Sequence, residues 1–410
     1  MQQPGNARDD GAAQAPPLSG IRVLDLSRVL AGPWCTQTLA DLGADVWKVE
    51  PPGAGDDTRS WLAAALDGRS TYFMSANRSK RSLAVDLRRP SGRAVVRALA
   101  MKADILVENF KLGGLDRFGL GYQDLSTENP CLVYCSISGY GRTGSRAAEA
   151  GYDFVMQAES GLMAITGEPD GEPMRLGVAI TDIATGMNAV QAILAALIAR
   201  GRTGRGQFID MALHDTGVTL LANIGQGALA TGQHPGRFGN AHATIVPYQT
   251  FQASDKTFVL AIGNDLQFRR LCERVLYRPE LAREPAYASN RLRVENRERL
   301  VAELAAIFKT LPAAEWLARL RQAGVPGGSV REVLDVLASP EVAERGLFAT
   351  VESELHGSLP LMASPLKLRG TPVLPPRHPP SVGEHTAEIL SDVLDMTETE
   401  IAAFVSEHQE

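Results

Sequence analysis

One aspartate, Asp182, stands where a short β-prone run, 177–181, meets a long apolar segment. Large apolar side chains follow it at helical spacing, at Ile183, Met187, Val190, Leu194 and Leu197. The spacing predicts a core-facing helix that begins at Asp182. A carboxylate there would accept hydrogen bonds from free backbone N–H groups and feel the positive end of the helix dipole, so we expect it to be ionised at neutral pH. The plainer interpretation is an N-cap, but the small residues Ala179, Ala184 and Gly186 leave room for a ligand beside it.

Other polar groups could do chemistry, each with a plainer alternative. Tyr152 and Asp153 precede an apolar helix and could cap it, and His242, near Asn240, could be a surface histidine of a flexible loop. Basic residues gather at Arg78, Lys80, Arg81, Arg88, Arg89, Lys111 and Arg117, with Asn109 and Phe110 beside them. Such a cluster can hold phosphates under an aromatic that covers a planar base, or it can be solvated surface charge. The G-x-G-x-x-G run at 139–144 opens no clear helix, which favours a glycine-rich loop over a dinucleotide site.

The elements that must position these groups alternate between strand and helix. Strands are predicted at 21–26, 45–50, 104–109, 131–137 and 207–212, with helices at 32–42, 91–102 and 182–200. This α/β order predicts a parallel sheet covered on both faces. Paired strands at 245–251 and 257–262, followed by helices at 266–277, 293–308 and 313–323, predict a smaller α+β domain.

The domain organisation follows from these segments. We expect a disordered tail at 1–19, a large domain at 20–220, a linker at 221–244, the small domain at 245–326, and a C-terminal part at 327–410.

Composition narrows the class of protein. The 410 residues are 44% hydrophobic and 21% charged, as in ordinary globular proteins, and a net charge of -6 disfavours a nucleic-acid binder. The most apolar uncharged window, 183–199, is a little short for a bilayer span. The four cysteines show no disulfide or zinc-ligand spacing. We therefore expect a reduced, cytoplasmic protein without a metal site or membrane segment.

Several short motifs, in order, resemble the class III (CaiB/BaiF type) CoA-transferase family. They are Val23–Leu26 with Ala31–Pro33 and Leu42–Asp45; Lys48–Glu50 with Gly55–Asp56; Asn77–Ser82; Val107–Phe110 with Leu115–Arg117; Thr203–Gln207; and Gly383–Thr386. The resemblance covers nearly the whole chain after the tail. It implies a Rossmann-like large domain, an interlocked-ring homodimer, and no permanently bound cofactor, with a coenzyme A thioester as substrate.

The resemblance also assigns roles to residues. Asp182 matches the family's nucleophile, with Asp153 and Tyr152 beside the reaction. CoA binding falls on Leu30, Ala31, Val85, Arg88, Asn109, Phe110, Lys111 and Arg117, and we place the acceptor acid near His242 and Asn240. Leu30 and Pro51 replace a glutamine and an arginine of formyl-CoA transferases, which puts formate and oxalate in doubt.

The expected reaction moves CoA from an acyl-CoA donor, succinyl-CoA, to a small dicarboxylate such as glutarate or itaconate through an aspartyl-CoA intermediate. The alternatives are an α-methylacyl-CoA racemase-type isomerase, a formyl-CoA/oxalate transferase, and a non-catalytic CoA- or nucleotide-binding protein. Racemases of this fold use a histidine as partner base where this chain has Tyr152, a poorer proton shuttle at neutral pH, which favours the transferase.

Overall fold

A computed structural model describes residues 14–353 and 357–408, which fold into two compact units. The first unit comprises the described residues up to Leu162, Leu176–Gly225, and those from Glu341 onward. The second comprises Met163–Arg175 and Gln226–Pro340.

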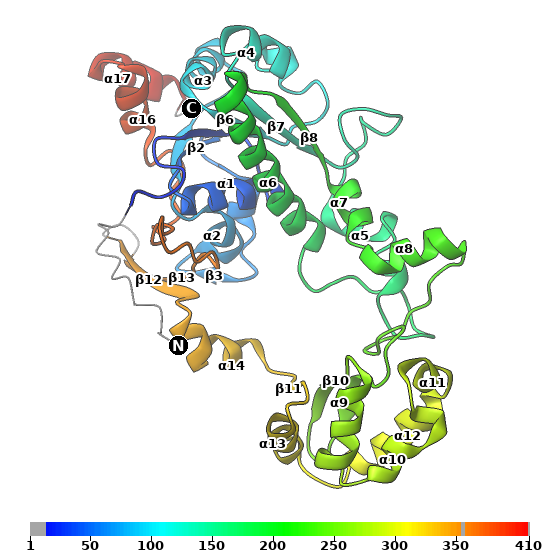
Figure 1. The fold of residues 1–410 in the computed structure, drawn as a ribbon. Coiled ribbons are helices and arrows are strands. Elements are labelled where there is room, and N and C mark those ends of the chain that lie inside the picture. The colour runs from blue at the N-terminus through cyan, green and yellow to red at the C-terminus, as the bar shows by residue number, and fades with distance from the viewer. Residues whose placement is uncertain (1–13, 354–356, 409–410) are drawn as a thin grey trace, which may run out of the picture. The chain divides into compact units, whose positions relative to one another are not determined.

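A six-stranded parallel sheet forms the centre of the first unit (Figure 1). Its strands are β1 (Arg22–Asp25), β2 (Asp45–Glu50), β5 (Arg81–Ala84), β6 (Ile105–Glu108), β7 (Val133–Ser138) and β8 (Phe208–Ala212). They lie in the order β5-β2-β1-β6-β7-β8, and Val23 of β1 pairs with Val46 on one side and Ile105 on the other. The predicted parallel sheet is confirmed. Successive strands extend the sheet away from β1 in one direction and away from β6 in the other, so a topological switch point lies at the carboxyl ends of β1 and β6.

Helices cover both faces of this sheet, because neighbouring side chains of a strand point to opposite sides. Val23 belongs to a core with α1 (Ala31–Asp41) and α6 (Ile180–Thr203). Leu24 belongs to a core with α3 (Pro90–Lys102), α4 (Tyr122–Glu128), α16 (Thr386–Leu394) and α17 (Glu398–His408). The C-terminal helices therefore complete the same core that the N-terminal strands begin.

Shorter elements complete the first unit. They are the 3₁₀ turns η1 (Asp57–Ser60) and η2 (Asp116–Phe118), the hairpins β3 (Ala65–Leu66) with β4 (Arg69–Ser70) and β12 (Phe348–Ser353) with β13 (Gly357–Met362), and helices α2 (Thr71–Asn77), α5 (Asp153–Glu159) and α7 (Leu213–Thr219). Helices α8 (Ala222–Thr231) and α15 (Pro340–Glu344) include residues of both units.

The second unit is an α+β structure with its own aromatic core. Antiparallel strands β9 (Tyr248–Gln252), β10 (Thr257–Ala261) and β11 (Gly327–Ser329) pair in the order β11-β10-β9. The same unit contains η3 (Met163–Ile165), α9 (Asp265–Arg270), a π-helical turn η4 (Leu271–Val275), α10 (Pro279–Arg283), η5 (Pro285–Tyr287), α11 (Asn290–Glu295), α12 (Arg297–Phe308), α13 (Ala313–Ala323) and α14 (Val333–Leu337). Phe258, Phe308 and Trp316 make edge-to-face contacts in this core.

Three local expectations need correction. The 221–244 segment is not simply a linker, because α8 occupies much of it. Part of the expected disordered tail is ordered: Leu18 is buried and its N–H donates to the carbonyl of Leu42 at 2.9 Å, whereas residues 1–13 lie outside the described part of the chain. Residues 163–175 and 327–340 group with the second unit. The other expected domain boundaries stay predictions.

Helix α6 differs from its predicted form at both its start and its buried face. It begins at Ile180, and residues 177–178 form a bend rather than a strand. Its buried face carries Thr185, Gly186, Ala189, Val190, Ile193 and Ala196, whereas Met187 is 53% exposed. Small residues are needed on part of this face because α6 packs closely on α1. A Cβ on Gly186 would lie only 2.7 Å from the carbonyl oxygen of Ala31.

Among the described helices, α6 alone is long and apolar enough to cross a bilayer. It is longer than the window expected from the sequence. Part of its apolar surface is buried against α1 and the sheet, whereas Met187 and Ile198 are exposed.

Candidate active site

The start of α6 is capped by an aspartate from another helix, α5. Asp153 is the first residue of α5 and is buried, yet its carboxylate turns to α6. Its Oδ1 accepts hydrogen bonds from the N–H and Oγ1 of Thr181, at 2.8 and 2.6 Å, and from the N–H of Asp182 at 3.3 Å. Its Oδ2 accepts from Nε2 of Gln157 at 2.7 Å. Asp153 therefore fixes the first turn of α6 and places its negative charge beside Asp182.

Asp182 lies in that first turn, as the third residue of α6, and does not cap the helix. Burial, and then the charge of Asp153, raise the pKa of Asp182 from 3.8 to about 7. The expectation of an N-cap that is fully ionised at neutral pH is therefore wrong. The cap comes from Asp153, 29 positions earlier, and the Asp182 carboxylate has no hydrogen bond or ion pair with any described residue.

A tyrosine that the sequence did not single out lies in the electrostatic field of both carboxylates. Burial, followed by the charges of Asp182, Asp153 and Asp56, raises the pKa of Tyr72 to about 12. Its ring contacts Trp61 edge-to-face, with centroids 4.8 Å apart. Tyr72 stands on α2, a seven-residue helix without a clear periodic pattern, so sequence periodicity gave no signal for it.

Tyr152, expected beside the reaction, occupies the N-cap position of α5 without a side-chain capping bond, and it is 69% exposed. Its role stays a prediction.

A cavity of about 230 Å³ brings together four residues expected to bind CoA. Val85, Arg88, Phe110 and Arg117 line it, together with residues that the sequence did not single out for this role, among them Arg28, Asp86 and Phe118. The Arg28 guanidinium lies 5.7 Å from the ring centre of Phe110. Arg88 pairs with Asp86 at 2.9 Å, whereas Arg117 lies over the ring of Phe118 and has no ion pair with a described residue. The cavity thus combines planar rings with cationic groups, which suits a nucleotide.

The remaining expected CoA contacts are spread around this cavity. Leu30 and Ala31 are buried where α1 begins, at the switch point. Asn109 follows β6 and bonds the backbone of Arg28, with its Oδ1 accepting from the N–H and its Nδ2 donating to the carbonyl oxygen. Lys111 instead lines a separate cavity of about 200 Å³ with Glu108 and Arg142. The structure therefore brings Lys111 to a different cavity from Arg88 and Arg117.

Beneath the switch point lies a buried network of acids and lysines. Lys80 bonds Asp25 at 3.0 Å, and Lys48 bonds Asp56 at 3.0 Å, with all four side chains inaccessible to solvent. Burial opposes the charge of Asp25, but Lys80 and Lys48 outweigh it and hold the pKa of Asp25 at about 2. Burial lowers the pKa of Lys80 to about 8 despite Asp25. These residues belong to the short motifs noted in the sequence, but their spacing along the chain did not predict that their side chains would contact one another.

His242 and Asn240, expected to hold the acceptor acid, belong to the second unit. The His242 ring lies 5.3 Å from that of Tyr248, its Nδ1 accepts from the N–H of Thr244, and its carbonyl oxygen accepts from Arg297. Their role in substrate binding stays a prediction. Among the residues that the structure describes, no group of three or more His, Cys, Asp or Glu side chains could hold a metal ion.

Comparison with known proteins identifies the family. A sequence model described as "CoA-transferase family III" matches residues 18–386. The chain belongs to CoA-transferase family III. It is therefore an enzyme whose substrates are CoA thioesters, as the sequence motifs predicted.

Family III relatives match over most of their lengths. The succinate–glutarate CoA-transferase of Agrobacterium fabrum is 45% identical over 92% of this chain and 96% of its own. The succinyl-CoA:glutarate CoA-transferase of Mus musculus is 44% identical over 92% of this chain and 86% of its own. A crystal structure of a CAIB/BAIF family protein from Brucella suis is 46% identical and superposes with a TM-score of 0.83, covering 93% of this chain and all of the other.

Proposed function

We propose that this enzyme transfers CoA from succinyl-CoA to glutarate, with Asp182 as the nucleophile. Two relatives support this choice of substrates, and each is 44–45% identical over about nine-tenths of this chain. One is named a succinyl-CoA:glutarate CoA-transferase, and the other a succinate–glutarate CoA-transferase. The observation that carries the assignment of the nucleophile is the position of Asp182. It is a partly buried carboxylate, unpaired among the described residues, in a helix turn that another carboxylate already caps.

The proposed reaction proceeds through four acyl-transfer steps at one carboxylate. An ionised oxygen of Asp182 attacks the thioester carbonyl of succinyl-CoA, and the C–S bond breaks to give a mixed anhydride and CoA thiolate. The thiolate attacks the aspartyl carbonyl of the anhydride and releases succinate, leaving an aspartyl-CoA thioester. A carboxylate oxygen of glutarate attacks that thioester, and its C–S bond breaks to give a second anhydride and CoA thiolate. This thiolate then attacks the glutaryl carbonyl of the anhydride. Glutaryl-CoA leaves, and Asp182 is restored as a carboxylate.

The surroundings of Asp182 favour this sequence of steps. A carboxylate of ordinary basicity is a weak nucleophile toward a thioester, because thiolate is much more basic and returns readily. Raising the pKa of Asp182 to about 7 narrows that gap in basicity. Acylation also removes the negative charge from Asp182, so burial and the nearby charge of Asp153 favour the acylated state over the free carboxylate.

The nucleotide end of CoA has a candidate site in the 230 Å³ cavity. Arg28, Arg88 and Arg117 supply positive charge for phosphate groups, and Phe110 supplies a ring beside a planar base. The cavity lies at the carboxyl ends of the strands beside the β1/β6 switch point, where open α/β sheets bind ligands.

The chain is also proposed to form the interlocked homodimer that the family resemblance implies. In support, the first unit exposes large apolar side chains on and near α5 and α6, including Tyr152, Val155, Val178 and Met187. Exposed apolar surface of this kind commonly marks a protein interface. Light scattering should give twice the mass of one chain.

One assay separates the transferase from an isomerase. Wild-type enzyme is incubated with succinyl-CoA and glutarate in deuterium oxide, and the CoA products are separated by chromatography. The proposal predicts glutaryl-CoA without deuterium at the α-carbon. Deuterium incorporation at the α-carbon without exchange of CoA would instead indicate a racemase-type reaction. The choice of acceptor is tested by replacing glutarate with other acids, including itaconate and oxalate.

A further inference from the structure

Val29, in the loop between β1 and α1, has an unusual backbone conformation. Its φ is +71°, in the left-handed region that β-branched residues rarely enter. Such a conformation persists only where the surrounding structure imposes it, and it occurs most often at functional sites. The loop lies at the β1/β6 switch point, directly before Leu30 and Ala31.

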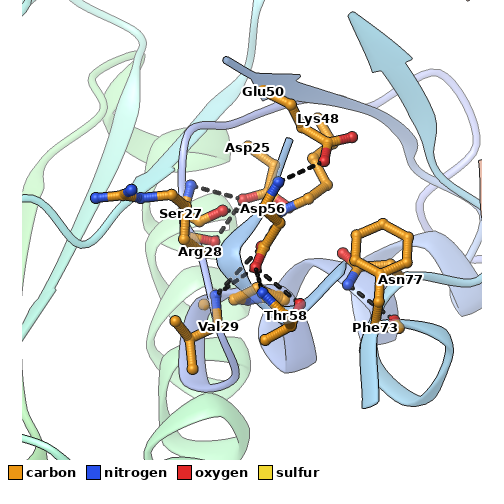
Figure 2. Close-up of polar contacts among 12 residues, drawn as sticks. Asp25, Ser27, Arg28, Val29, Lys48, Glu50, Asp56, Thr58, Phe73 and Asn77 are labelled. Atoms are coloured by element: carbon orange, nitrogen blue, oxygen red, sulfur yellow. Dashed lines mark hydrogen bonds and ion pairs between the residues drawn. The ribbon is translucent and has the colours of Figure 1, made fainter. Parts of the chain in front are cut away.

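Asp56 holds this conformation from one side (Figure 2). The N–H of Val29 donates to both carboxylate oxygens of Asp56, at 3.3 and 3.2 Å. The carboxylate is itself fixed, because its Oδ2 accepts from Nζ of Lys48 at 3.0 Å and its Oδ1 accepts from the N–H and Oγ1 of Thr58 at 3.0 and 2.8 Å. The N–H of Asp56 donates to Oε2 of Glu50 at 3.0 Å.

The loop is held from two further directions. Lys48 donates to the carbonyl oxygen of Ser27 at 2.9 Å, so one lysine ties both Asp56 and the loop to β2. The side-chain amide of Asn109 bonds the N–H and the carbonyl oxygen of Arg28, at 2.9 and 2.8 Å. The backbone of residues 27–29 therefore has little freedom before any ligand binds.

This loop joins the cavity to the helix of the nucleophile. The side chain of Arg28 lines the 230 Å³ cavity. Two residues beyond Val29, the carbonyl oxygen of Ala31 packs against Gly186 of α6, about one turn after Asp182. A change of φ at Val29 would redirect both Arg28 and the first turn of α1.

We propose that Asp56 is a positioning residue for acyl-CoA: it holds Val29 in the left-handed conformation and thereby sets the loop 28–31 for CoA binding. This inference rests on the proposed function. Asp56 does not touch the substrate. It acts through the backbone of Val29, and its partner Lys48 keeps it ionised and immobile.

A double-mutant cycle tests the coupling between Asp56 and Val29, with binding of free CoA measured by calorimetry. Asp56→Asn should weaken CoA binding at least tenfold in the wild-type background, because the amide cannot replace both the Lys48 contact and the bond to Val29. In the Val29→Gly background the same change should weaken binding less than threefold, because glycine adopts a positive φ without support. In turnover assays, Asp56→Asn should raise KM for succinyl-CoA more than it lowers kcat.

Equal losses in the two backgrounds would overturn the proposal, because loss of the buried Lys48–Asp56 pair alone acts equally in both. Free CoA serves as the probe so that the cycle does not depend on the acceptor acid. A wild-type protein that does not bind CoA would refute the proposed function, and this inference with it. Equal losses alongside intact wild-type binding would refute the inference alone.

A second measurement applies if the Asp56→Asn protein does not fold. Amide hydrogen exchange of wild type should show the peptide spanning 27–31 protected before CoA is added, with little further protection afterwards. Fast exchange that slows only on CoA binding would contradict a loop that is set in advance.

Discussion

Replacing Asp182 by asparagine should stabilise the protein at alkaline pH while abolishing transfer of CoA. Asp182 has a folded-state pKa of about 7 against an ordinary 3.8, so between these values the folded protein binds a proton that the unfolded chain does not. Stability is therefore lost as pH rises through this window. At about 1.4 kcal/mol per unit, the loss is about 1.5 kcal/mol at pH 5 and reaches at most about 4 kcal/mol at pH 8. The Asp182→Asn variant would show no such loss, because the amide carries no charge.

The assay compares the melting temperatures of the two proteins at pH 5 and pH 8 without substrate. With about 2 °C per kcal/mol for a domain of this size, the advantage of Asp182→Asn should grow by about 5 °C between the two pH values. Asp124→Asn is a matched control, since Asp124 is also the third residue of its helix, α4, but is exposed. Its effect should stay within the few tenths to about 1 kcal/mol of a helix-dipole contact. A melting difference for Asp182→Asn that does not change with pH would show that the pKa of Asp182 is not raised in the folded protein.

Three further predictions concern the site. The rate of the first acyl transfer, measured by stopped flow, should rise with pH through about 7, because only ionised Asp182 attacks. Asp153→Asn should shift this rise in rate to lower pH. A rate that is independent of pH between about 5.5 and 8.5 would contradict the prediction. Arg117→Met should weaken CoA binding, measured by calorimetry, about tenfold. Arg88→Met should weaken it less, because Asp86 already offsets the charge of Arg88. Equal effects of the two variants would argue against that difference. Gly186→Ala should lower the free energy of unfolding by about 1–3 kcal/mol by forcing α6 from α1, whereas Gly201→Ala, in the same helix with nothing within 4 Å of its added Cβ, should not; urea denaturation decides.

The strands of the sheet could be predicted because each leaves a local pattern. The run at 45–50 matches β2 residue for residue, and the alternation of strands with helices predicts a parallel sheet. The start of α6 was misplaced because its cap is not local. The carboxylate that satisfies its first N–H groups is Asp153, which lies on another helix. With that capping position filled, Asp182 is partly buried, and its carboxylate makes no hydrogen bond to any described residue. Its pKa therefore moves in the direction opposite to that expected for a cap.

The site was predicted where a motif could be matched and missed where only the fold brings residues together. Arg88, Phe110 and Arg117 came from the family resemblance, and they do line one cavity. Arg28 and Tyr72 carried no signal, because their neighbours in space are far away in sequence. The ties of Asp56 to Lys48 and Val29 likewise require the packing of β2 beside β1.

If Asp182 is the nucleophile, its carboxylate becomes covalently bonded to CoA during turnover. The most direct measurement is mass spectrometry of the peptide containing Asp182, from enzyme incubated with succinyl-CoA alone and quenched in acid. We expect a CoA adduct on Asp182 that disappears when glutarate is added. An unmodified peptide from enzyme that turns over, or full activity of Asp182→Ala, would contradict it.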